Sequence, residues 1–115
     1  MATPDTEQLL ALLCQSVERL SEPAESQVAW LRTQSLTDAD ELALEFDDIY
    51  PAVAQLHGTP LSDRSLRLLA RLNTVLDELS EDPERWQLDA LTEDFAWREV
   101  RQLAGDILAE VRHAA

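Results

Sequence analysis

The stretch from Leu61 to Leu79 constrains the fold most, because its apolar residues cannot all face water. At about 100° per residue they cover more than half of a helical circumference. They are Leu66, Leu68, Leu69, Leu72, Val75, Leu76 and Leu79. Ser62 stands where the N-cap of this helix belongs, and Asp63 falls in its first turn. The sequence therefore predicts a Leu-rich helix that ends near Ser80 and is covered by several neighbours.

Amphipathic periodicity predicts helices elsewhere in the chain as well. We expect them over about 4–20, 23–34 and 38–56, then one or two turns from Asp82-Pro83 and a final helix after Asp94. Thr3 and Thr37 are the expected N-caps of the first and third. Pro51 should kink the third helix or divide it in two. The prediction is a single all-α domain over residues 1–115: an irregular bundle of four principal helices plus one or two short helices around the central Leu-rich helix.

The net charge limits the kinds of molecule that the chain can bind. Asp and Glu number 23 against nine basic residues, all of them Arg, and the net charge is −14. Such a field repels nucleic acid and anionic membranes and favours a basic protein partner. The single cysteine, Cys14, fits a reducing compartment. Neither a signal peptide nor a membrane span is visible, so the expected location is the cytoplasm.

The densest charge lies in the third predicted helix. Six carboxylates fall within eleven residues there, without one Arg: Asp38, Asp40, Glu41, Glu45, Asp47 and Asp48. Arg64, Arg67 and Arg71 could neutralise part of this stretch if the third helix packs antiparallel on the Leu-rich helix. In that register Asp48 pairs with Arg71, a bridge that contributes about 0.2–1 kcal/mol. The other five carboxylates are then left as an acidic patch that is either solvated or offered to a basic partner.

Tryptophan is enriched at the energetic centres of protein interfaces, which makes the three tryptophans informative. Trp97 lies on the apolar stripe of the final helix and should be buried. Trp30 and Trp86 lie in weakly patterned segments. One of them is either exposed for a partner or covers the edge of the bundle with its N–H bonded.

The sequence offers little for catalysis. It has two histidines, His57 and His113, and none of the common phosphate-binding, zinc or nucleophile motifs. Carboxylates of residues 41, 45 and 48 facing those of 78, 81 and 82 could hold magnesium, as in the all-α nucleotide pyrophosphohydrolases, but the spacing of such enzymes is not reproduced. We therefore expect no catalytic residue, metal or cofactor.

These observations favour a non-catalytic protein-binding module. Its expected contact residues are Asp38, Asp40, Glu41, Glu45, Asp47, Trp30 and Trp86. In size, charge and helical character the chain resembles the small immunity and inhibitor proteins that neutralise bacterial toxins, which implies a basic protein as partner. A carboxylate and magnesium-dependent hydrolase and a mimic of the DNA backbone are the alternatives. The sequence also leaves a homodimer open.

Overall fold

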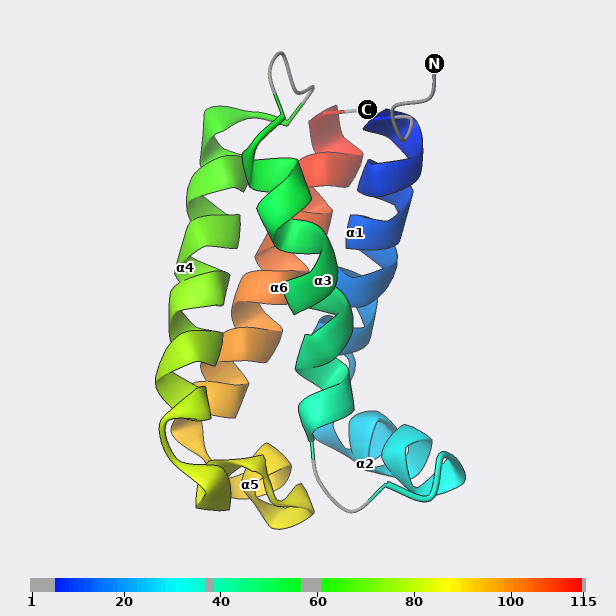
Figure 1. Cartoon of the computed structure of the whole chain (residues 1–115), viewed down its shortest axis with the longest axis vertical. Helices are drawn as coiled ribbons and strands as arrows, with labels where there is room; N and C mark the ends of the chain where they lie inside the picture. Colours follow the sequence, from blue (N-terminus) through cyan, green and yellow to red (C-terminus); the bar gives the residue numbers. More distant parts are fainter. Residues whose placement is uncertain (1–5, 37–38, 57–60, 115) are drawn as a thin grey trace.

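The computed structural model describes residues 6–36, 39–56 and 61–114, with side chains as far as Arg112. Within these ranges the chain forms helices and no strand (Figure 1). Four helices are long: α1 (Thr6–Ser21), α3 (Asp40–Ala54), α4 (Asp63–Ser80) and α6 (Phe95–Ala114). Three are short: α2 (Ala24–Thr33), the 3-10 helix η1 (Pro83–Trp86) and α5 (Leu88–Glu93). The predicted all-α bundle is confirmed, and α5 is a short helix beyond those expected.

The long helices pack in the spatial order α3, α1, α6, α4. Helix α1 packs closely on both α3 and α6, and α4 packs on the other side of α6, whereas α3 and α4 touch only slightly. Figure 1 accordingly shows α4 along one edge and α6 between its neighbours. The position of the Leu-rich helix α4 thus differs from the expected central one. Its fully buried residues follow one another at helical spacing on a single face, so one principal neighbour, α6, covers most of them.

Local signals in the sequence set several helix ends. Ser62 Oγ accepts the backbone N–H of Ser65 at 3.1 Å, which confirms the predicted N-cap of α4. Asp82 caps η1 in the same manner. Helix α3 runs unbroken past Pro51, so the predicted division in two does not occur, and the alternative, a kink at Pro51, stays a prediction. The predicted caps Thr3 and Thr37 lie outside the described residues.

One hydrophobic core runs through the bundle and includes Trp97, which is fully buried as predicted. At one end of the bundle the short helices α2 and α5 pack together (Figure 1). Buried Gln27 of α2 donates to the carbonyl oxygens of Arg19 and Leu20 in the last turn of α1. Arg101 of α6 donates to the carbonyl of Leu91 in α5. Side chains at this end of the bundle therefore bond backbone carbonyls near the end of α1 and in α5, and so link the short helices to the long ones.

None of the described helices is both long enough and apolar enough to span a bilayer.

Candidate protein-binding groove

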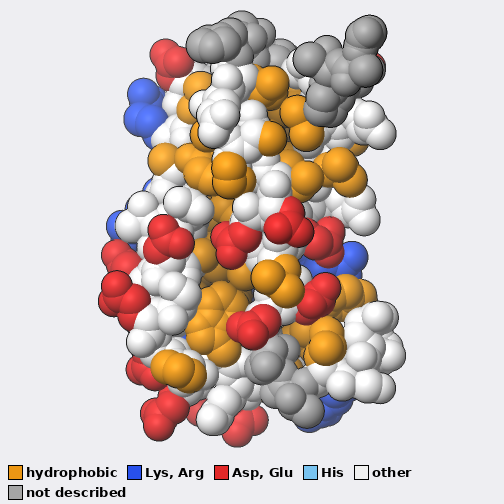
Figure 2. Space-filling model, viewed as in Figure 1, with side chains coloured by type: hydrophobic (Ala, Val, Ile, Leu, Met, Phe, Trp, Pro, Cys, Tyr) orange, Lys and Arg blue, Asp and Glu red, His pale blue; other side chains and the backbone are white. Residues whose placement is uncertain are grey.

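The slight contact between α3 and α4 leaves a groove between them. Its volume is about 590 Å³. Eight residues line it: Asp40, Ala43, Leu44 and Asp47 from α3, Ser80 from α4, and Pro83, Trp86 and Gln87 from η1 and its end. Figure 2 looks onto this face and shows carboxylates around apolar side chains over α3 and α4. The groove thus has an apolar floor and an acidic border.

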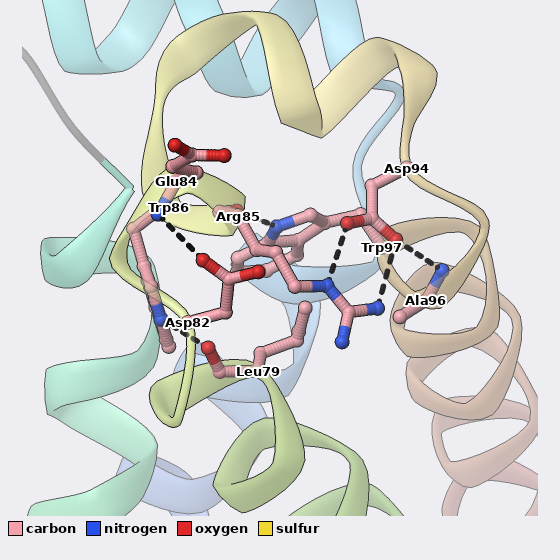
Figure 3. A network of polar contacts seen from close by, with 8 residues as sticks. All are labelled: Leu79, Asp82, Glu84, Arg85, Trp86, Asp94, Ala96 and Trp97. Carbon is pink, nitrogen blue, oxygen red and sulfur yellow. Dashed lines mark hydrogen bonds and ion pairs between the residues drawn. The ribbon is translucent and has the colours of Figure 1, made fainter.

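Trp86 forms a fixed part of the floor (Figure 3). Its indole Nε1–H donates to the carbonyl of Leu79 at 2.7 Å, in the last turn of α4. Its ring meets Trp97 edge to face, with centroids 5.3 Å apart. Its own carbonyl accepts the N–H of Ala39, just before α3, at 2.7 Å. One residue therefore ties the end of α4 to the beginning of α3, which fixes both walls of the groove.

The neighbours of Trp86 are tied down in turn. Trp97 Nε1–H donates to the carbonyl of Arg85 at 2.7 Å. The Arg85 guanidinium makes two bonds to Asp94, at 2.8 and 3.0 Å, and Asp94 also accepts the N–H of Ala96 at the start of α6. The hydrogen bond from Arg85 is the main reason that the pKa of Asp94 lies below its ordinary value. This bidentate pair closes the corner behind the groove.

The electrostatics of the groove differ from those around Asp94, whose carboxylate is paired with an arginine. Asp47 has no ion-pair partner among the described residues, and no Arg belongs to the groove lining. Partial burial raises the pKa of Asp47, and the negative charges of Asp77 on α4 and Asp48 raise it further. Negative charges of α3 and α4 therefore act on one another beside the groove, and no arginine of the described residues lines it.

The predicted bridge between Asp48 and Arg71 is wrong. Arg71 binds Glu99 of α6 at 2.9 Å, and Arg64 reaches Glu110 of the same helix at 3.4 Å. The reason is the packing: α4 turns Arg64 and Arg71 toward α6, its principal neighbour, and α3 packs on α1 instead. Two of the three arginines expected to neutralise the acidic stretch are consequently paired elsewhere.

Glu45 does not belong to the groove. It accepts a hydrogen bond from Arg19 of α1 at 3.1 Å, and the Arg19 guanidinium lies 3.9 Å from the ring centroid of Trp30. Glu45 and Trp30, two predicted contact residues, therefore both contact Arg19 of α1. Glu41 is half-buried and is not in the groove lining either. Asp38 lies outside the described residues. Of the predicted contact residues, the structure brings Asp40, Asp47 and Trp86 together.

Sequence reasoning missed the other lining residues for an identifiable reason. Leu44 lies off the apolar stripe of α3 and is 46% exposed, so a Leu on the acidic side of the helix was the available signal. Asp77 sits on the polar side of α4, and only the real helix packing brings it near Asp47. Pro83 and Gln87 belong to a turn whose placement the sequence did not fix.

Other chemistry finds less support in the arrangement. Within the described ranges no three His, Cys, Asp or Glu side chains lie together in a way that could hold a metal ion, the opposed carboxylates of α3 and α4 included. Burial is the main reason that the pKa of the half-buried Cys14 thiol is raised, which lowers its reactivity. His57 and the side chain of His113 are outside the described part of the chain.

Comparison with models of protein families, with curated proteins and with solved structures gave no match for this chain.

Proposed function

We propose that this protein is a non-catalytic module that binds a basic segment of another protein in the groove between α3 and α4. The observation that supports this most is a groove with an apolar floor whose described lining includes Asp40 and Asp47 and no arginine, with the charge of Asp77 on α4 acting on Asp47 as well. A lysine or arginine of a partner would supply the missing countercharge. Apolar contact with Leu44 and Trp86 would add affinity, while the charges speed association and select the partner.

The chain's own arginines support the same proposal. Within the described ranges five arginines are each paired with a carboxylate, and among these carboxylates only Glu45 comes from the acidic stretch. The five are Arg19, Arg64, Arg71, Arg85 and Arg112. None of these five ion pairs involves Asp47, so the charge of Asp47 can attract a cation of a partner. Carboxylates crowded without countercharge cost stability in the free protein, and a bound cation would offset that cost.

A charge reversal on α4 tests the proposal. Immobilised wild-type protein should retain a basic protein from a lysate of the source cells, identified by mass spectrometry, and Asp77→Arg should lose it. Asp63→Arg is the matched control, because it makes the same charge change on the same helix about 21 Å away along the axis, at 1.5 Å per residue. Melting curves of both variants verify that the fold is retained.

Two results would count against the proposal. One is retention of the same partner by Asp77→Arg, which would place the contact elsewhere. The other is a large rise in melting temperature on adding sub-millimolar magnesium or manganese, which would favour the hydrolase alternative instead.

A further inference from the structure

The wall that α3 contributes to the groove has an ordered pattern. Asp40, Ala43, Leu44 and Asp47 follow the spacing i, i+3, i+4 and i+7, so they form one stripe about 10 Å long at 1.5 Å per residue. The ends of this stripe are acidic and its middle is apolar. A segment that matches it carries a cation, then an apolar side chain, then a cation, over the same length.

The form of such a segment follows from what borders the groove. One long wall is α3, and the other is the end of α4 with η1 and Gln87. Within the described ranges the chain has no strand whose edge could pair with an extended peptide. Helix surfaces receive another helix by seating its side-chain ridges between their own. An amphipathic helix also repeats its contacts at i, i+3, i+4 and i+7, the spacing of the α3 stripe.

The floor is ready for an apolar side chain without rearrangement. Trp86 is held through its indole N–H by Leu79 and through its carbonyl by Ala39, and it rests against the buried ring of Trp97. Leu44 faces it from α3, 46% exposed. A contact surface that is already rigid loses little conformational entropy on binding.

From these observations we infer that the occupant of the groove is a two-turn amphipathic helix of a partner protein, with Arg or Lys at each end and a large apolar residue between them. This inference rests on the proposed function and specifies the partner segment. One cation lies against Asp47, where the charge of Asp77 adds to the attraction, and the other lies toward Asp40. The apolar residue contacts Leu44 and Trp86.

The test uses a synthetic probe in place of a natural partner. The peptide is stapled into a helix of about 12 residues, because unstapled helices of that length are marginal in water. It carries two arginines seven positions apart with leucines at the third and fourth positions after the first. A control peptide has the same composition with the arginines and leucines permuted around the helix. Fluorescence anisotropy of the labelled peptides measures binding, and the indole N–H resonance of Trp86 reports contact with the floor.

We expect the patterned peptide to bind and to shift the Trp86 resonance, and the permuted peptide to bind at least about tenfold more weakly. Leu44→Asp and Asp77→Arg should each weaken binding at least about tenfold. Leu12→Asp is matched to Leu44→Asp, since Leu12 is 43% exposed on α1, and it should change binding less than about twofold, as should Asp63→Arg.

Three outcomes would overturn the inference. Equal binding of both peptides would show that net charge alone, and not the pattern of side chains, accounts for the binding. Capture of a basic protein that depends on Asp77, without binding of the patterned helix, would leave the proposed function standing and remove the helical occupant. A dimer in light scattering that Asp77→Arg dissociates would make a second copy of this chain the occupant instead.

Discussion

Two neighbouring regions of the molecule use the same residue types with opposite results. In the corner formed by η1, α5 and α6, Asp94 is bonded to Arg85 and to the N–H of Ala96, and its pKa is lowered. In the groove between α3 and α4, Asp47 meets Asp77 and Asp48, and its pKa is raised. The difference teaches that Arg85 stabilises the corner by pairing with its carboxylate, whereas no arginine in the described part of the chain lines the groove.

The largest expected effect is loss of the packed corner. Trp97→Ala should destabilise the protein by about 3–5 kcal/mol, because it removes a fully buried ring and leaves the Arg85 carbonyl without its donor. Urea unfolding measures the change. Trp30→Ala, on the α1 side, is the comparison and should cost clearly less because Trp30 is only half-buried. Equal losses of unfolding free energy would show that the corner contributes no more to stability than the α1 side does.

Next in size is the ion pair that closes the corner. Asp94→Ala should cost about 1–3 kcal/mol at neutral pH, since it removes two bonds from Arg85 and the cap on Ala96. The lowered pKa of Asp94 stabilises the folded protein above the ordinary pKa of Asp, and this contribution is lost as the pH falls through the lower folded pKa. Unfolding of Asp94→Asn and wild type across that acid range should therefore converge. A constant difference would mean that the charge of Asp94 does not matter.

A substitution outside both regions provides a reference value for changes in the free energy of unfolding. A Cβ added at Gly105 in α6 would meet no atom within 4 Å, so the glycine is not required for close helix contact. Gly105→Ala should stabilise the protein by about 0.5–1 kcal/mol through helix propensity alone. Thermal melting checks this, and a loss of stability would reveal a requirement that the packing does not show.

The smallest effect is expected in the groove. Removing a carboxylate there should stabilise the protein, whereas removing that of Asp94 destabilises it. Because the folded pKa of Asp47 is raised, its ionised form costs stability above that pKa, and the cost disappears as the pH falls below the unfolded value. Asp47→Asn should therefore stabilise the protein at neutral pH, by a few tenths of a kcal/mol as for like-charge pairs on helices. Asp63→Asn, in the first turn of α4, should instead destabilise it through the helix dipole. Unfolding at neutral and acid pH distinguishes the two, and a destabilising Asp47→Asn would contradict the comparison.

The sequence predicted the fold well because its signals are local. The N-caps Ser62 and Asp82 and the burial of Trp97 follow from residues close in the chain, and the structure agrees with them. The partners of Arg71 and Glu45 did not follow, because a salt bridge between helices depends on which helices pack together. Periodicity gives the apolar face of a helix but not the neighbour that covers it. The groove was partly predicted for the same reason. Asp47 was recognisable as an excess charge, whereas the place of Leu44 in the groove and the effect of Asp77 on Asp47 depend on how α3 and α4 pack.

The bond between the Ala39 amide and the Trp86 carbonyl has a consequence for detecting ligands. That amide belongs to the α3 side, yet its protection from deuterium depends on a residue at the opposite wall. Any molecule that wedges the walls apart will accelerate its exchange, and any molecule that clamps them will slow it. One backbone proton therefore reports on both sides of the opening at once, without a label or a mutation.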